Sequence, residues 1–195
     1  MKVIQVRCPH CSVPIQMKQR DHLFYCQSCG TLHTRDDGVE SLDYEIADIK
    51  TSSSASRYYM PFWRLYCDFT VKSKEIKGGT MFKIASLIKG SSDGGSLFIF
   101  VPASDLDINT FRNWAVRLTT KPPMYATRKD FGGIERMAAS VSRKEAEEMA
   151  DFVAVTLEAE QPGTLQRLDY SLKVNSSKVI YLPFVQTGSG LVLAI

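Results

Sequence analysis

Cys8-Pro9-His10-Cys11 and, fourteen residues further on, Cys26-Gln27-Ser28-Cys29-Gly30 decide the fold of the first part of the chain. Two residues separate the cysteines of each pair, so the backbone can turn tightly and point both sulfurs at one metal ion. The segment between the pairs is long enough for a β-hairpin that brings the second pair over the first. Zinc prefers four tetrahedral ligands and accepts thiolates readily. The spacing therefore predicts one zinc ion bound by Cys8, Cys11, Cys26 and Cys29.

A metal ion with four protein ligands has no open position for water or substrate, so the predicted zinc is structural. Two alternatives use the same cysteines: an iron site of the rubredoxin or iron–sulfur type, and redox chemistry at the cysteine pairs. Two pairs at this separation favour one shared metal over a redox role. His10 and His33 lie beside the pairs in the sequence, and we expect them on the surface or just outside the ligand shell.

Charge and composition divide the rest of the chain. Residues 1–35 carry a net charge of +4, whereas residues 36–49 hold six acids and no base. A serine-rich run follows with little apolar mass to bury, as in a linker. We therefore predict a zinc ribbon over 1–35, an acidic and serine-rich linker over 36–57, and a domain over 58–195 that is large enough to fold without a metal.

The pattern after the linker predicts an α+β domain with a mostly antiparallel sheet and two helices. Apolar and polar residues alternate from Phe62 to Lys72, as in a long, half-buried strand. One helix is expected over 106–118 with Asp107 as its N-cap, and a second begins at the capping box Ser142/Glu145. Further strands are expected over 81–89, 97–101, 164–174, 178–185 and 191–195.

One short segment occurs twice. Tyr59-Met60-Pro61-Phe62 resembles Tyr181-Leu182-Pro183-Phe184. Proline in a sheet is confined to edges, strand starts and bulges, so the two copies are expected to mark matching strand starts. Four residues are too few to establish an internal repeat.

Aromatic and basic residues are mixed at the start of the predicted domain, within a stretch, residues 50–130, whose net charge is +7. Such a surface could stack nucleic-acid bases or contact a partner protein. Ordinary packing within a sheet is the alternative, because alternation turns only some of these side chains outward. The candidate binding surface consists of Arg57, Tyr59, Phe62, Trp63 and Arg64.

The sequence offers no arrangement typical of an enzyme. No histidine follows His33, which excludes Cys-His and Ser-His-Asp arrangements in the predicted domain. The glycine-rich stretch 92–96 matches neither a phosphate-binding loop nor a dinucleotide fingerprint. Cys67 lies on the apolar face of the alternating strand and is expected in the core. We predict a protein that is not an enzyme and has no small-molecule substrate; the alternative is an enzyme that uses carboxylates, which a deep pocket lined by acids with raised pKa values would indicate.

Residues 1–35, with their CPHC and CQSCG motifs, resemble the zinc ribbons of transcription factors, ribosomal proteins and uncharacterised bacterial zinc-ribbon proteins. The resemblance implies a ribbon fold and zinc ligation by the four cysteines named above. It covers less than a fifth of the chain and implies no single function, because ribbons bind DNA, RNA and proteins alike.

We therefore expect a non-enzymatic binding or assembly protein that acts through protein–protein contacts, at the ribbon or where the ribbon meets the main domain. The alternative is DNA or RNA binding through the basic ribbon and the basic stretch 50–130. No segment reaches the roughly 18 apolar residues of a membrane helix, and no signal peptide is visible. Cysteine pairs that bind metal fit a reducing compartment, so a cytoplasmic protein is expected.

Overall fold

A computed structural model describes residues 6–15, 20–36, 39–50, 56–77, 89–91, 94–159, 164–188 and 190–195. The predicted α+β class is confirmed, since two helices accompany mostly antiparallel sheets in these residues. The predicted strand over 81–89 lies outside the described residues except for Lys89, where β8 begins.

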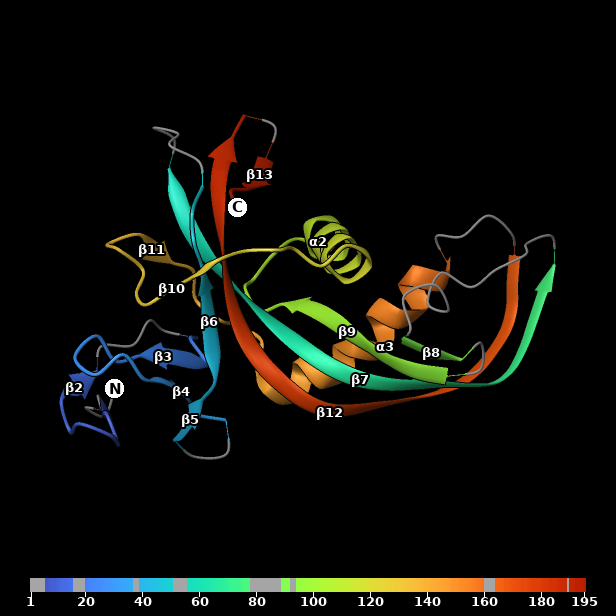
Figure 1. The fold of residues 1–195 in the computed structure, drawn as a ribbon, viewed down its shortest axis with the longest axis horizontal. Coiled ribbons are helices and arrows are strands. Elements are labelled where there is room, and N and C mark those ends of the chain that lie inside the picture. The colour runs from blue at the N-terminus through green and yellow to red at the C-terminus, as the bar shows by residue number, and fades with distance from the viewer. Residues whose placement is uncertain are drawn as a thin grey trace.

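The paired cysteines lie in turns between short strands, and these strands are at one end of the molecule (Figure 1). β1 (Val6–Arg7) and β2 (Pro14–Ile15) form a two-stranded hairpin. β3 (Leu23–Tyr25), β4 (Leu32–Thr34) and β5 (Glu40–Leu42) form a three-stranded antiparallel sheet. We call residues 6–15 and 20–35, which contain β1 to β4, the cysteine module.

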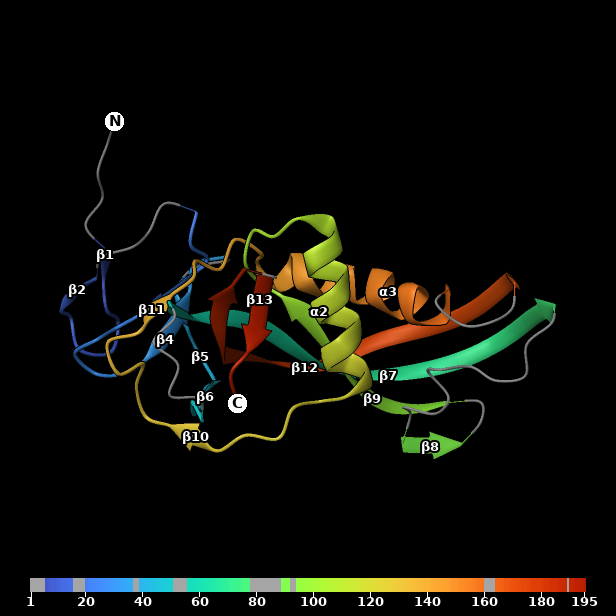
Figure 2. The same ribbon diagram turned by 90° about the horizontal axis from the view of Figure 1, so that it is seen from above.

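An eight-stranded sheet makes up most of the remaining structure, and with the two helices we call it the main domain. Its centre is the antiparallel pair of β7 (Arg57–Lys77) and β12 (Thr164–Thr187). Figures 1 and 2 show the two strands side by side, with the end of β7 and the start of β12 at the end of the molecule opposite the cysteine module. The other strands are β6 (Tyr44–Ala47), β8 (Lys89–Ser91), β9 (Gly94–Pro102), β10 (Thr127–Arg128), β11 (Glu135–Arg136) and β13 (Gly190–Leu193).

Sequence alternation predicts two strands over 164–174 and 178–185, but these residues form the single strand β12. A register shift against β7 falls between Val174 and Ser176, inside the gap that separated the two predictions. A bulge adds one residue to a strand and disturbs its alternation without ending it. The chain therefore stays extended where the pattern indicated a break.

Alternate residues of β7 pack into two hydrophobic clusters. The predicted apolar face is confirmed, because Trp63, Leu65, Cys67 and Phe69 are fully buried in the cluster that also contains α3 (Arg143–Ala159). Each such side chain contributes roughly 1.5–3 kcal/mol by leaving water. The other face is covered near its start, where Phe62 packs with residues of α2 (Ile108–Thr120). Beyond Phe62 this face holds the half-buried or exposed residues Arg64, Tyr66, Asp68, Thr70 and Lys72.

Both helices begin at the predicted caps. The Asp107 carboxylate accepts the backbone N–H groups of Asn109 and Thr110, each at 3.1 Å. In the capping box, the Ser142 N–H donates to Glu145 at 2.7 Å, and the Glu145 N–H donates to the Ser142 hydroxyl at 3.2 Å. These bonds satisfy amides that have no partner within the helix.

The two copies of the repeated segment pair with each other, with Pro61 opposite Tyr181 and Pro183 opposite Tyr59. They do not mark strand starts, because each proline lies inside its long strand. Pro61 falls between the residues of β7 that pair with β11 and those that pair with β9. Pro183 falls likewise between the β6 and β13 pairings of β12. Proline lacks an N–H, and both copies therefore occupy a gap between neighbouring strands.

The predicted linker contains two strands. β5 extends the three-stranded sheet, and β6 joins the main sheet in parallel with β12. The described acidic residues of this stretch are not uniformly solvated: Asp36 and Glu45 each accept hydrogen bonds from distant parts of the chain. Residues 51–55, which hold most of the serine-rich run, lie outside the described residues. Independent folding of the two parts stays a prediction.

Candidate metal centre and adjoining groove

Two backbone turns of matching geometry present the four cysteines. The Ser12 N–H donates to the Cys8 carbonyl at 2.8 Å, and the Gly30 N–H donates to the Cys26 carbonyl at the same distance. The residue after each second cysteine adopts a positive φ, which is 60° at Ser12 and 72° at Gly30. Glycine adopts this conformation without cost, whereas another L-residue loses roughly 1–2 kcal/mol. The first turn therefore carries strain that the second avoids.

The four sulfur atoms lie within 4.8 Å of one another, as the spacing predicted. The sulfurs of Cys8 and Cys29 are 3.6 Å apart, and those of Cys11 and Cys26 are 3.5 Å apart. A tetrahedral ion with metal–sulfur bonds of about 2.3 Å holds its ligands about 3.8 Å apart. The cluster therefore fits one tetrahedral metal ion, and thiolate donors favour soft or borderline metals.

Neighbouring groups act differently on the cysteine thiols. Hydrogen bonds from Thr31 lower the pKa of Cys29 to about 6. A backbone hydrogen bond from Val13 lowers the pKa of Cys11, but desolvation and the three nearby thiols outweigh it and raise that pKa to about 11. Because thiolates are the metal-binding form, metal binding displaces protons from the cluster and depends on pH.

The buried side chain of His33 packs directly against the cysteine cluster. Its Nε2 atom lies 3.3 Å from the Cys8 sulfur, and its ring stacks on Phe24 with centroids 5.3 Å apart. Only 1% of the residue is exposed, and desolvation lowers the pKa of the imidazole, which favours the neutral ring. A neutral ring with its proton on Nε2 can donate to the Cys8 thiolate. His33 thus lies just outside the ligand shell, one of the two predicted positions, while His10 is exposed.

A buried ion pair attaches the cysteine module to the main domain. Asp21 is completely buried and pairs with Arg136 of β11. The same carboxylate accepts the backbone N–H of Ala139 at 2.9 Å and that of Leu23 at 3.2 Å. Burial lowers the pKa of Arg136, but Tyr181 and Asp21 outweigh that effect and raise it. A buried charge is tolerated when it is paired and hydrogen-bonded, and the Asp21 carboxylate meets both conditions through contacts with Arg136 and Ala139 on the main-domain side.

A second polar contact lies beside the first. One Asp36 oxygen lies 2.7 Å from Nδ1 of His22, and the other accepts the N–H of Arg143 at 3.1 Å. Arg143 begins α3, so the carboxylate lies at the positive end of that helix. Asp36 therefore connects the cysteine module to the helix that covers the main sheet.

Phe131 connects the two parts through aromatic contacts. Its ring makes edge contacts with Tyr25 of the cysteine module and with Tyr59 and Tyr181 of the main domain, at centroid distances of 4.9–5.3 Å. Leu23 and Leu32 of the module belong to the same hydrophobic cluster. The apolar core therefore continues across the boundary.

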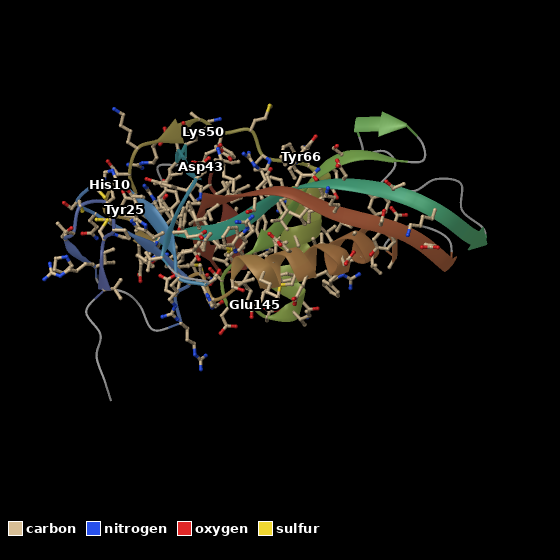
Figure 3. The ribbon with its side chains drawn as sticks, turned by 90° about the horizontal axis from the view of Figure 1, so that it is seen from below. His10, Tyr25, Asp43, Lys50, Tyr66 and Glu145 are labelled. Atoms are coloured by element: carbon tan, nitrogen blue, oxygen red, sulfur yellow. The ribbon has the colours of Figure 1, made fainter. Side chains whose placement is uncertain are left out.

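A groove of about 760 Å³ opens where the cysteine module meets both helices. Its apolar wall includes Ile108 of α2 and Phe152 of α3, which are 65% and 46% exposed. Figure 3 shows Glu145, at its edge, on the opposite side of the sheet from Tyr66. The volume lies within the usual 300–1,000 Å³ range of ligand sites. Nothing in the local sequence pattern predicts this groove, since its residues come from four separate segments of the chain.

The structure corrects the predicted binding surface. Tyr59, Phe62 and Trp63 are completely buried, and they therefore belong to the core. The alternative of ordinary sheet packing is confirmed for these three residues. Arg57 and Arg64 are half-buried. This part of β7 is covered on both faces, which alternation alone does not reveal.

A different aromatic and basic patch lies on the open face of the sheet. Tyr66 and Phe98 are 37% and 39% exposed, with ring centroids 5.1 Å apart. The Arg64 guanidinium lies 5.3 Å from the centre of the Phe98 ring, and Lys178 lines the same hollow. Arg64 and Lys178 also contact Glu45, at 3.4 and 3.1 Å, so part of their charge is neutralised.

Comparison of the chain with protein-family models, curated proteins and solved structures gave no match. Within the described residues, neither helix combines the length and the apolar character needed to cross a membrane. Function is therefore inferred from the geometry of the cysteine cluster, the groove and the open sheet face.

Proposed function

We propose that this chain is a non-enzymatic zinc-ribbon protein that binds or assembles protein partners at the junction of its cysteine module and main domain. The observation that carries the proposal is the groove of about 760 Å³ between the module and the two helices. A partner seated there would contact both parts of the molecule at once.

Zinc is the proposed metal, and its role is structural. Four thiolates fill a tetrahedral shell, so the ion would supply cross-linking of the two cysteine turns. Cys8, Cys11, Cys26 and Cys29 would hold it, while His33 and Thr31 would hydrogen-bond to the sulfurs of Cys8 and Cys29. Elemental analysis of purified protein should give one zinc per chain. One iron per chain, with visible absorption from thiolate-to-iron charge transfer, would replace zinc in the proposal.

The metal supports partner binding by fixing the module. The module reaches the groove through Arg20, His22 and Arg35, which flank β3 and β4. These strands also carry the second cysteine pair between them. Loss of the metal should therefore disorder one wall of the groove while the helical wall remains.

Affinity purification from the native cell, with and without nuclease, tests the proposal. Protein partners that survive nuclease with the wild-type chain, and are lost with the Cys26→Ser variant, are the expected result. A Cys67→Ser variant is the matched control, since Cys67 is buried in the main domain and lies outside the cluster. If the same partners are recovered with Cys26→Ser, the module does not contribute to the binding site, and this part of the proposal is wrong.

Nucleic-acid binding is the second candidate, and one observation favours it. Tyr66 and Phe98 expose aromatic rings beside Arg64 and Lys178, a combination that can stack bases and contact phosphates. Partners that disappear on nuclease treatment would support it. Binding of single-stranded DNA or RNA should then weaken steeply with salt and should depend on Tyr66.

A further inference from the structure

The groove has an apolar side and a basic side. Its apolar side is formed by the helices and the loops before them, where Leu106, Ile108, Phe111, Val141, Met149 and Phe152 line it. Ile108 and Phe152 are large apolar residues exposed on two different helices, yet they face one shared hollow. A hydrophobic side chain placed between them would remove apolar surface of both from water.

The basic side comes from the cysteine module. Arg20 precedes β3 and Arg35 follows β4, and the antiparallel pairing of Leu23 with Thr34 brings both arginines to the same end of this hairpin. Both are exposed and line the groove. Neither forms an ion pair with the described residues of the chain.

The acidic residues at the groove form no ion pair with Arg20 or Arg35 within the described residues, so both guanidinium groups can contact a partner. Glu145 already accepts two hydrogen bonds from Ser142 in the capping box. Asp36 is held between His22 and the start of α3. Asp105 lies with the helical wall, in the loop before α2. The groove is therefore lined by two arginines of the module as well as by apolar residues of the helices and the loops before them.

We propose that this groove binds a segment of a partner protein that places an apolar side chain between α2 and α3 and a carboxylate against Arg20 and Arg35. This inference rests on the proposed function and names the chemistry of the partner. Charge complementarity selects the carboxylate, because guanidinium groups bind carboxylates through paired hydrogen bonds. The apolar anchor supplies most of the affinity, and the acid fixes the orientation of the segment.

The first test uses a displayed library of random peptides, selected on the metal-loaded full chain. Selected peptides should combine a large apolar residue with Asp or Glu and should be poor in Lys and Arg. A selection without enrichment, or one that enriches basic residues, contradicts the inference.

The second test measures binding of one selected peptide, labelled with fluorescein, to variants of the groove. Ile108→Asp and Phe152→Asp should each weaken binding at least about tenfold, because they place a charge against the apolar anchor. Val155→Asp is the matched control, since Val155 lies on the same helix as Phe152, is 43% exposed and does not line the groove. Circular dichroism should show the same helix content in all three.

Exchanging the charge on the basic side gives the sharpest discrimination. The double variant Arg20→Glu/Arg35→Glu should lose affinity for the acidic peptide and gain affinity for the same peptide with lysine in place of its acids. Equal binding of both peptides to the wild-type chain would overturn the inference. So would a wild-type dimer that Phe152→Asp converts to a monomer in analytical ultracentrifugation, because a second copy would then occupy the groove.

The outcomes separate this inference from the proposed function. If nuclease-resistant partners are lost with Phe152→Asp but retained with Arg20→Glu/Arg35→Glu, the groove binds proteins as the proposed function states, but it does not select a carboxylate. If no partner co-purifies with the wild-type chain, the proposed function itself fails, whatever the peptides do.

Discussion

In the cysteine module the strands are two or three residues long, whereas β7 and β12 of the main domain run for 21 and 24 residues. The main domain buries apolar side chains in two clusters, but the module contributes mainly Leu23, Phe24 and Leu32 to the core. Small units with little apolar surface to bury generally need a metal or disulfides. A metal bound by the four cysteines would therefore stabilise the module, as the hydrophobic core stabilises the main domain.

The contact between the two parts combines polar and apolar forces. Asp21 and Asp36 direct the module onto the main domain through hydrogen bonds, and Phe131 packs against aromatic rings of both. Directional polar contacts fix orientation more than they add stability. The module is therefore positioned by a few specific groups, and each of these groups can be removed separately.

The largest expected effect comes from Cys26→Ser. Replacing one of four ligands should abolish stoichiometric zinc binding and unfold the module, because structural zinc contributes roughly 10 kcal/mol or more to small metal-dependent units. Hydrogen exchange should then be fast in β3 and β4 and remain slow in the centre of β7 and β12. Zinc content and exchange measured by mass spectrometry check both parts of this prediction.

Equal loss of protection in β7 and β12 would contradict it and would mean that module and main domain unfold as one cooperative unit. This outcome has to be tested, because Leu23 and Leu32 of the module share a hydrophobic cluster with the main domain. Cys67→Ser, with zinc retained, is the control for the loss of a buried thiol.

The next largest effect is expected for Asp21→Ala. Removal of the carboxylate leaves Arg136 buried and deprives the N–H groups of Leu23 and Ala139 of their acceptor. Breaking a buried ion pair from one side usually costs about 3–5 kcal/mol. Urea unfolding of the zinc-loaded protein measures the loss.

A double-mutant cycle sharpens this result. Arg136→Met in the Asp21→Ala background should recover part of the stability, because it removes the buried charge that has lost its carboxylate partner. Additive losses would show that the two side chains do not interact energetically.

A smaller effect, dependent on pH, is expected for Glu45→Gln at the surface of the main sheet. Burial raises the pKa of Glu45, but hydrogen bonds from Tyr125 and Lys178 and the charge of Arg64 outweigh it and hold the pKa below its ordinary value of 4.5. A lowered folded-state pKa stabilises the protein above the unfolded-state pKa, and this contribution is lost as pH falls through the folded-state pKa. The variant should lose about 1 kcal/mol at neutral pH and less at about pH 3, where part of this contribution is gone.

Urea titrations at both pH values check this prediction. Glu148→Gln serves as the control, because Glu148 is exposed on α3 and makes no ion pair within the described residues. A loss for Glu45→Gln that is the same at both pH values would mean that charge is not its cause.

The smallest effect compares the two cysteine turns. Ser12→Gly should stabilise the zinc-loaded module by up to about 1 kcal/mol, since glycine adopts the positive φ without strain. Gly30→Ala should destabilise it by a similar amount through backbone strain alone, because the added methyl carbon would lie 3.6 Å from its nearest neighbour. Competition with a zinc chelator measures both. Opposite signs are expected, and equal signs would show that the turns differ in more than this φ angle.

The features that the sequence predicted correctly depend on residues close together in the chain. Paired cysteines, the Asp107 cap and the Ser142/Glu145 capping box lie within a few residues of their partners. The alternation of apolar and polar residues along β7 likewise predicts the buried face correctly wherever the other face of the strand is exposed to solvent. The mixture of aromatic and basic residues at the start of β7 was a wrong guide at Tyr59 and Phe62, because β7 is covered on both faces there and its buried aromatics resemble an exposed aromatic patch in sequence.

By itself, then, the sequence determined the four-sulfur cluster, the helix starts and the apolar face of the longest predicted strand, because short-range geometry governs each of them. Only the tertiary structure decided the partner of Asp21, which lies 115 residues away, the pairing of the two Tyr-x-Pro-Phe segments, and the groove between module and helices. The physical reason is that a carboxylate, a proline or an exposed phenylalanine has the same local signature whether it faces solvent or a distant segment. Its role depends on which segments the packed core brings beside it.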